Sequence, residues 1–241
     1  MKYLYTILLL AVMALWPYTC SAQNDFEDFE DFEEEFTRNS FSIADPLRPV
    51  NKFMFMVNDK IYFIIIKPLA KQYKKITPKP ARISLKNFFN NLAAPGRFAN
   101  CILQGKFHSA NTEFKRFAVN STVGILGLSD PARDKMGLMQ TNEDLGQTLA
   151  KYGFGNGFYV VWPLLGPSTL RDSVGLVGDS FTNPIMYLKS TRVYIAASVA
   201  KSANEYSFRL GDYKAFKEGT IDPYTAMRDA YIQYRRKMVQ E

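Results

Sequence analysis

Histidine and cysteine, two residue types that commonly perform catalysis, are sparse in this chain of 241 residues. His108 is the only histidine, and it lies in the loop-like segment Gly-Lys-Phe-His-Ser-Ala-Asn. A Ser-His-Asp triad would have to use this residue, and no nucleophile elbow accompanies it. We therefore predict that the protein is not an enzyme. A lipid hydrolase stays open as an alternative, which unchanged ester hydrolysis in His108→Ala would exclude.

The sequence offers no catalytic, metal or cofactor site of a familiar kind. Removal of an N-terminal signal segment would leave Cys101 as the single cysteine, in an apolar stretch typical of a small core residue. One histidine and one cysteine cannot form a zinc site of the usual kind. The glycines at 153–158 lack the Lys-Ser/Thr of a P-loop. The carboxylates have no metal-binding spacing: Asp130, Asp144, Asp172 and Asp179.

The first 22 residues have the pattern of a secretory signal peptide. Lys2 precedes an apolar run over residues 3–16, and Cys20-Ser21-Ala22 follows it, so we predict cleavage after Ala22. The apolar run is shorter than the roughly 20 residues of a spanning helix. Acylation of Cys20 is an alternative, but we favour ordinary cleavage because Pro-Tyr-Thr precedes this cysteine. The chain is exported in either case.

Charge is divided unevenly along the chain. Residues 24–36 contain eight acids and no base, whereas the chain after Phe36 has 29 Lys and Arg against 15 Asp and Glu. We predict that residues 23–44 form a disordered, self-repelling linker. Its phenylalanines stand at helical steps, which leaves open an amphipathic helix on a partner. The basic residues of the body alternate with apolar ones, which disfavours nucleic acid and favours phospholipid headgroups.

The stretch Asp45–Asn58 predicts a helix that is apolar on nearly every side. Asp45-Pro46 is typical of a helix start, and Lys67-Pro68 is expected to end the helix. A stripe at steps of three and four predicts a buried face: Leu47, Val50, Met54, Val57, Ile61 and Ile64. Phenylalanines and Met56 cover much of the remaining surface. Such a helix lies either in a large core or against lipid.

Proline and glycine divide the rest of the chain into short helices. After an extended link at 77–80, we expect helices over residues 82–93, 96–104, 109–122, 141–153, 168–177, 184–208 and 223–238. In the helix at 109–122, Phe114 and Phe117 should face inward and Glu113 and Arg116 outward. Only Phe158–Trp162 has a strand-like pattern, too short to found a sheet. The sequence therefore predicts an all-α fold with a single domain over residues 45–241.

No segment of the body has the pattern of a membrane-spanning helix. Lys60 and Lys67 bracket the first apolar run, and Lys189, Arg192 and Lys201 interrupt the helix expected from residue 184. Short apolar helices with basic residues near their ends suit a protein that lies within one leaflet. A water-soluble helical protein of the periplasm, acting as a lipid-binding protein or scaffold, is the alternative.

Five blocks of the sequence resemble the MlaA/VacJ family, in order and with similar spacing from Asp45 to Arg235. The blocks are DPLRPVNKFMFMVN, TPKPARISLKNFFNNLAAP, FKRFAVNSTVGILGLSDPA, EDLGQTLAKYGFGNGFYVVWPLLGPSTLRDSVG and DPYTAMRDAYIQYR. Enterobacterial members of the family are acylated lipoproteins, whereas this chain has a weak acylation site and an added acidic linker. The difference concerns the mode of anchoring.

The resemblance implies a specific architecture and function. Family members form a ring of short amphipathic helices in the periplasmic leaflet of the Gram-negative outer membrane. A passive amphipathic channel through the ring removes mislocalised phospholipids from the outer leaflet and passes them to a periplasmic carrier of the MlaC type, which maintains lipid asymmetry. In enterobacteria the ring also contacts a trimeric porin, and the resemblance leaves that partner open here.

The resemblance also suggests roles for particular residues. Basic residues that would attract the lipid phosphate along the channel are Lys189, Arg192 and Lys201. The loop at 123–128 matches a family hairpin that controls access to the channel, and its glycines would supply flexibility; its candidate gating residues are Gly124, Leu126 and Gly127. Apolar residues that would seat the ring in the membrane are Phe53, Phe55, Met56, Phe63 and Ile65.

Overall fold

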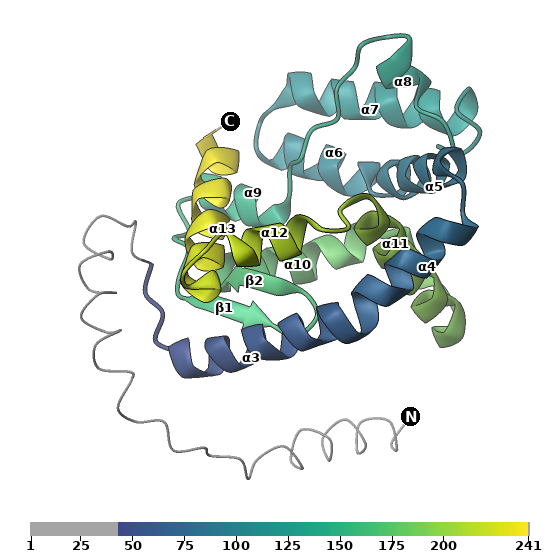
Figure 1. Ribbon diagram of the computed structural model, residues 1–241. Helices are drawn as coiled ribbons and strands as arrows, with labels where there is room; N and C mark the ends of the chain where they lie inside the picture. Colours follow the sequence, from purple (N-terminus) through teal and green to yellow (C-terminus); the bar gives the residue numbers. More distant parts are fainter. Residues whose placement is uncertain (1–42, 241) are drawn as a thin grey trace, which may run out of the picture. The chain divides into compact units, whose positions relative to one another are not determined.

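Helices make up most of the chain between residues 43 and 240, which are the residues that this computed structural model describes (Figure 1). In chain order the elements are α3 (Arg48–Ile61), the π-helical segment η1 (Tyr62–Ile66), α4 (Lys67–Ile76), α5 (Lys79–Leu92), α6 (Ala94–Leu103), α7 (Phe107–Thr122), α8 (Pro131–Asp134), α9 (Leu145–Lys151), β1 (Tyr159–Trp162), β2 (Gly166–Thr169), α10 (Leu170–Thr182), the 3-10 turn η2 (Pro184–Tyr187), α11 (Thr191–Phe208), α12 (Asp212–Glu218) and α13 (Pro223–Gln240). The prediction of a single helical domain is confirmed.

The predicted signal peptide, Cys20 and nearly all of the predicted linker lie outside the described residues. The folded unit begins at Ile43, two residues earlier than we predicted. Ile43 packs against the apolar core, and the Tyr159 N–H donates to the Ala44 carbonyl at 3.0 Å. These two residues therefore extend the folded domain.

The first helix does not end at Lys67-Pro68, and that prediction is wrong. The chain stays helical from Arg48 to Ile76, through η1 and into α4 (Figure 1). The Lys67 N–H donates to the Tyr62 carbonyl, five residues back, which is the bonding of a π turn. Pro68, the second residue of α4, has no N–H to donate back into η1, so the helix continues past this proline with one backbone hydrogen bond fewer.

Two other expectations for this helix are also wrong. The N-cap of α3 is Leu47, and no side chain caps the helix. The Asp45 carboxylate instead accepts hydrogen bonds from the Asn51 side chain, at 2.7 Å, and from the Tyr224 hydroxyl of α13. Asn51 is the buried residue of α3, whereas Val50 of the expected buried stripe is exposed. Met54 of the stripe does pack against the core, so the sequence misplaced only part of the inward face.

Asn51 is buried because it satisfies the edge of a strand. Its Nδ2 donates to the Tyr159 carbonyl at 3.0 Å, and its Oδ1 accepts from the Val161 N–H at 2.9 Å. A buried strand edge without partners would be costly, and the asparagine provides both a donor and an acceptor. The bond pair fixes α3 along β1.

A short antiparallel hairpin replaces part of an expected helix. β1 pairs with β2 in a register that places Tyr159 opposite Thr169 and Trp162 opposite Gly166. The strand-like pattern of 158–162 was recognised in the sequence, but its partner was not. Helix α10 begins at Leu170 and not at Ser168, because Thr169 is the N-cap and accepts from the Asp172 N–H at 3.1 Å.

Several other boundaries differ from those predicted. Pro80 lies in the first turn of α5 and not in an extended link, and α9 begins at Leu145 after an Asp144 cap. The helix expected over 184–208 is divided into η2 and α11, and α12 was not predicted. The predicted Asp222 start of α13 is confirmed, since its Oδ1 accepts from the Tyr224 N–H at 2.9 Å.

Helix α7 presents the reverse of its predicted faces. Glu113 is 0% exposed and Arg116 is buried, whereas Phe114 is 57% exposed and Phe117 also faces outward. The expected orientation is therefore wrong: charged side chains turn inward and aromatic rings outward. Water-soluble proteins bury charged groups only when these are paired. Here Arg97 of α6 pairs with Glu113, and Asp130 in the loop before α8 pairs with Arg116.

Candidate functional site

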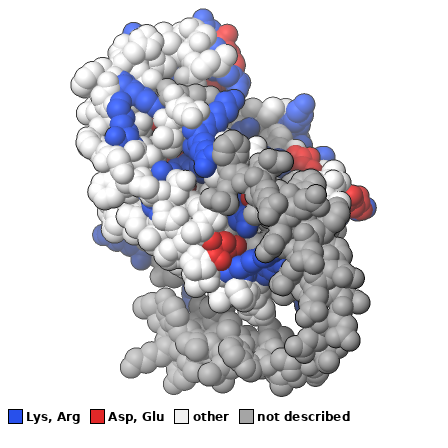
Figure 2. All heavy atoms as spheres, turned by 90° about the vertical axis from the view of Figure 1, so that its left-hand side faces the viewer, with Lys and Arg blue, Asp and Glu red and all other residues white. Residues whose placement is uncertain are grey.

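The interior of the described domain is unusually polar. More of its buried residues are polar or charged than apolar, and the apolar core is confined to a small cluster around Tyr159, Val161, Tyr224 and Ile232. At the exterior, by contrast, many large apolar side chains are exposed. Most atoms on the described face in Figure 2 belong to uncharged residues, and Lys and Arg there outnumber Asp and Glu.

A large open cavity lies within this polar interior. Its volume is about 730 Å³, and residues from α6, the β1–β2 hairpin, α10, α11 and α13 line it. One part of the lining is polar or charged: Asn100, Asp144, Asp172, Asp179, Lys201 and Arg235. Another part is apolar: Trp162, Leu165, Leu176, Ile185 and Met186. The cavity is therefore amphipathic and of a size found in binding sites for small molecules.

A buried charge cluster forms one wall of the cavity. The Arg235 guanidinium of α13 contacts the Asp172 carboxylate of α10 at 3.0 Å and the Asp144 carboxylate, the N-cap of α9. Arg171 adds a contact of 2.9 Å to Asp172. Burial alone would raise the pKa of Asp172, but the two arginines hold it below its usual value. The cluster therefore stays ionised and joins α9, α10 and α13.

Asp179 has the opposite electrostatic setting. Its carboxylate accepts from Asn100 Nδ2 at 2.8 Å and from the Leu145 N–H at 2.9 Å. Burial raises the pKa of Asp179, and these neutral donors offset the rise only in part. The cavity wall thus contains one carboxyl group whose charged form is disfavoured.

Lys201 differs from the two arginines that line the cavity. Arg97 is paired with Glu113 and Arg235 with two aspartates, whereas the Lys201 ammonium makes no hydrogen bond or ion pair with any residue of the described part of the chain. Its charge is available to an anionic group inside the cavity.

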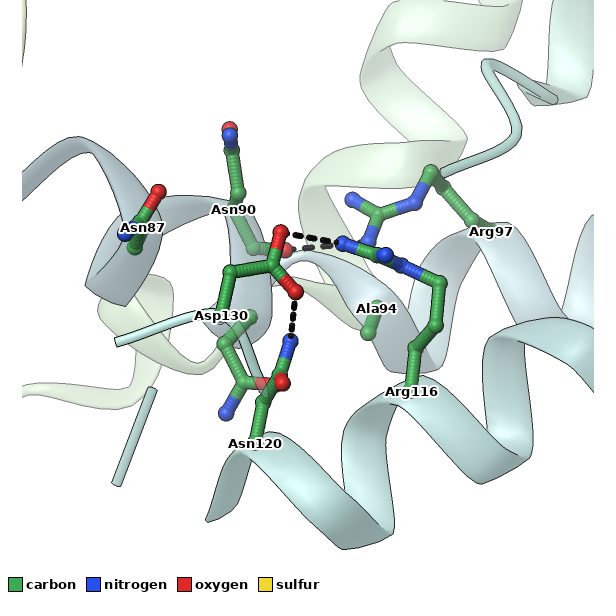
Figure 3. Close-up of a pocket in the computed structure, with 8 residues that line it drawn as sticks. Asn87, Asn90, Ala94, Arg97, Arg116, Asn120 and Asp130 are labelled. Atoms are coloured by element: carbon green, nitrogen blue, oxygen red, sulfur yellow. Dashed lines mark hydrogen bonds and ion pairs between the residues drawn. The ribbon is translucent and has the colours of Figure 1, made fainter. Parts of the chain in front are cut away.

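A second buried cluster joins α5, α6 and α7 to the loop before α8. Figure 3 shows Arg116 and Asn120 pointing toward Asp130, which accepts from them at 2.8 and 2.9 Å. Arg97 of α6 contacts Glu113 of α7 at 2.8 Å. Burial alone would raise the pKa of Asp130, but its hydrogen bonds hold it below the usual value.

This second cluster is a structural element and not a ligand site. The cavity beside it is only about 10 Å³, which suits at most one water molecule. The paired charges explain why α7 turns its polar face inward. Together they hold the chain on both sides of the candidate gating loop.

The candidate gating loop follows α7 directly. Ile125 and Leu126 have left-handed φ values of 53° and 55°, and Leu126 is exposed. A Cβ at Gly124 would lie 2.4 Å from the Asn120 carbonyl oxygen, and one at Gly127 would lie 2.4 Å from the Asn91 Cβ. Close packing therefore requires both glycines in this conformation. None of the three candidate gating residues lines the large cavity.

The candidate seating residues divide into two groups. Phe53, Met56 and Ile65 are exposed. Phe55 packs edge-on against the Tyr224 ring at 5.9 Å, and Phe63 lies 6.0 Å from the Tyr213 ring. The structure therefore places the first three on the outside of α3 and η1 and turns the other two inward.

The remaining candidates are also placed. Lys189 is exposed in the link before α11, and Arg192 is exposed in the first turn of α11. Neither lines the cavity, which Lys201 does. His108 is exposed and Cys101 is buried. Within residues 43–240, no three His, Cys, Asp or Glu residues are grouped to hold a metal ion. No helix in that range is both long and apolar enough to cross a membrane.

Sequence reasoning missed the residues that build the cavity wall. It noted Asp144, Asp172 and Asp179 as scattered carboxylates and did not consider Arg235. A usable signal was present, since Asp172 and Arg235 each stand in helices with apolar neighbours and would need partners if buried. Their pairing spans 63 residues and could not be read from local spacing.

Comparisons with known proteins point to one family. The sequence model described as MlaA lipoprotein matches residues 43–238. The intermembrane phospholipid transport system lipoprotein MlaA of Escherichia coli (strain K12) is 33% identical over 193 residues, covering 79% of this chain and 76% of the relative. An uncharacterized protein of Rickettsia prowazekii (strain Madrid E) is 33% identical over 202 residues, covering 82% and 79%.

A solved structure is similar as well. It comes from work on the structural basis for maintenance of bacterial outer membrane lipid asymmetry. Its chain is 30% identical to this one with a TM-score of 0.72, and the match covers 81% of this chain and 99% of the solved chain. The sequence match and the structural match span the same helical domain, and by both this chain belongs to the MlaA family.

Proposed function

We propose that this protein is a passive phospholipid channel of the outer membrane. It removes mislocalised phospholipids from the outer leaflet and passes them to a periplasmic carrier of the MlaC type, which maintains lipid asymmetry. The relative from Escherichia coli is named for intermembrane phospholipid transport. The single observation that supports the proposal most directly is the amphipathic cavity of about 730 Å³ in a polar interior.

The cavity suits the two chemistries of a phospholipid. Lys201 offers an unpaired ammonium to the phosphate, while Leu165, Leu176 and Met186 offer apolar surface to the acyl chains. Arg235 stays paired with its aspartates and keeps the wall rigid. Lys189, exposed in the link before α11, and Arg192, exposed in its first turn, would attract the phosphate before it enters.

The exterior suits a seat in the periplasmic leaflet without a spanning helix. Exposed Phe53, Met56 and Ile65 would contact acyl chains, as would Phe114 on the outward face of α7. We propose that the helices form a ring there and that the loop at 123–128 controls access to the channel. A trimeric porin is a further candidate partner.

Blocking the cavity tests the channel. Ser198→Trp would place a large side chain on the α11 wall, and Ser190→Trp, on the exposed link before α11, is the matched control. We expect the first variant to lose transfer of labelled phospholipid from outer-membrane vesicles to purified carrier, and the second to transfer normally. Normal transfer by Ser198→Trp, with its fold verified by circular dichroism, would refute the channel.

Fractionation of cells that produce the protein tests the alternative. A soluble periplasmic lipid-binding protein or scaffold would appear in the soluble fraction after cell disruption. A channel would require detergent for extraction. Recovery of the mature protein in the soluble periplasm would favour the alternative.

A further inference from the structure

Residues 60–112 carry ten Lys and Arg residues and not one Asp or Glu. This run covers η1, α4, α5, α6 and the first residues of α7. Some of its basic residues are used internally. Arg82 donates to the Ser207 hydroxyl at 3.0 Å, and Arg97 pairs with Glu113. Lys106 pairs with Glu143 at 2.7 Å, and most of the other basic residues are exposed.

Six of the lysines in this run are exposed, and one of them, Lys86, lies over the Phe208 ring at 5.6 Å. We refer to the other five as the lysine surface: Lys60, Lys71, Lys74, Lys75 and Lys79. None of them forms a hydrogen bond, ion pair or ring contact with the described part of the chain, whereas Lys67 lies over the Phe63 ring at 5.1 Å. The lysine surface therefore has a positive charge that the described residues do not compensate.

Helix α4 carries two different exposed stripes. Lys74 and Lys75 follow Lys71 by three and four residues, so the three lysines share one side of the helix. Leu69 and Ile76 are seven residues apart, two helical turns, and share another side. Both apolar residues are exposed, and Ile76 is 81% exposed.

The third side of α4 holds the helix in place. Ala70 is fully buried, and the Tyr73 hydroxyl donates to Asn204 Oδ1 of α11 at 3.0 Å. Figure 1 shows α4 beside α11 in this part of the domain. The lysines and the apolar stripe are thus presented by a rigid element, and substitution of the lysines leaves its packing side intact.

This combination selects one kind of partner. An acidic protein would match the lysines, but its polar surface would not match isoleucines as exposed as Ile64 and Ile76. A headgroup layer matches both, because phosphates lie beside acyl chains and a helix at that boundary places ammonium groups in one and isoleucine in the other.

We propose that the lysine surface binds anionic phospholipid headgroups and gives the protein a preference for membranes that contain them. The inference rests on the membrane seat of the proposed function and adds the headgroup chemistry to it. Each lysine close to an anionic surface favours binding by a factor of about five. Three of them together therefore favour it by roughly a hundredfold at low ionic strength.

Vesicle partition tests the proposal. Mature full-length protein is diluted from detergent onto vesicles of phosphatidylcholine alone or of an equimolar mixture of phosphatidylcholine and phosphatidylglycerol. For the triple variant Lys71→Gln, Lys74→Gln and Lys75→Gln, we expect partition onto the mixed vesicles to fall by roughly a hundredfold. Partition onto phosphatidylcholine should not change. Added salt should reduce the preference of the wild type.

A matched control removes the same charge from exposed lysines elsewhere: Lys115→Gln, Lys135→Gln and Lys214→Gln. An equal loss in this control would overturn the proposal, because net charge alone would then explain the effect. Unchanged partition of the α4 variant would overturn it too. The proposal would also be overturned if the α4 variant kept its partition onto anionic vesicles and lost only its affinity for an acidic carrier protein.

The outcome is separable from that of the channel. Ser198→Trp should block transfer and keep the preference for anionic vesicles. The α4 variant should lose this preference and still transfer phospholipid from neutral vesicles. A failed headgroup preference with normal transfer would therefore refute only the present inference. Failed blockage with an intact preference would refute only the channel.

Discussion

Asp172 is the residue whose single charge joins α10 to α13. Its carboxylate receives Arg171 and Arg235 and also accepts from the Tyr231 hydroxyl at 2.9 Å. Each arginine is buried beside it, so neither can turn to water if the carboxylate is lost. A buried pair of this kind contributes to specificity more than to net stability, but its disruption is costly.

Asp172→Asn should therefore destabilise the domain. We expect the free energy of unfolding to fall by roughly 3 kcal/mol, because Arg171 loses its carboxylate partner in a buried site and Arg235 keeps only Asp144. Asp134→Asn is the control, since its pair with Arg133 is exposed and should contribute less than about 1 kcal/mol. Chemical unfolding in detergent provides the measurement. Equal effects of the two substitutions would contradict the role assigned to Asp172.

The stability that Asp130 contributes in its cluster with Arg116 and Asn120 should depend on pH. Its pKa lies below the usual 3.8, so its contribution to stability is present above that value and is lost as pH falls through the folded-state pKa. We expect the stability difference between wild type and Asp130→Asn to shrink below about pH 4. Asp179→Asn should show the opposite trend, because burial raises that pKa. Unfolding curves at several pH values measure both.

Helix α3 has two functional sides, and substitutions should separate them. Met56 is exposed, so Met56→Asp should weaken outer-membrane fractionation and leave thermal stability nearly unchanged. Phe55 packs on Tyr224, so Phe55→Asp should lower the melting temperature by introducing a charge beside the core. Fractionation and thermal unfolding together distinguish the two. A Met56→Asp variant that still fractionates normally would remove Met56 from the membrane seat.

At this scale the sequence predicted which segments are helical better than which faces are buried. The helix start at Asp222 depends on local chemistry and was found, whereas the cap expected at Asp45 was not. The faces of α7 were inverted because periodicity identifies an apolar stripe without saying whether water or lipid meets it. β2 was missed because Gly-Pro-Ser-Thr lacks the pattern of a strand and pairs only through its neighbour.

The candidate site shows the same limit. Lys201 was found because a lysine in an apolar helix is a local anomaly. The Asp144–Arg235 contact depends on residues 91 positions apart and could not be predicted without the fold. The glycines of the loop were expected to supply flexibility, whereas their contacts with Asn120 and Asn91 indicate close packing.

The described domain combines a polar interior with many exposed apolar side chains, which fits the proposed seat among acyl chains. We expect the mature protein to enter the outer-membrane fraction and to co-purify with phospholipid after detergent extraction. Mass spectrometry of the bound lipids and of the mature N-terminus provides the measurement. A terminus at Gln23 would support ordinary cleavage after Ala22. A mature protein that begins with an acylated Cys20 would instead show that it is anchored as a lipoprotein.

The π-helical segment η1 (Tyr62–Ile66) should tolerate the deletion of one residue. A π turn holds one residue more than an α turn, so deleting one residue there would leave an ordinary α-helix whose downstream phase is preserved. Ile64 is 71% exposed and makes a natural candidate for such a deletion. The same deletion two turns earlier would rotate α4 by about 100° and exchange its stripes. Length variation among homologues should therefore concentrate at this turn.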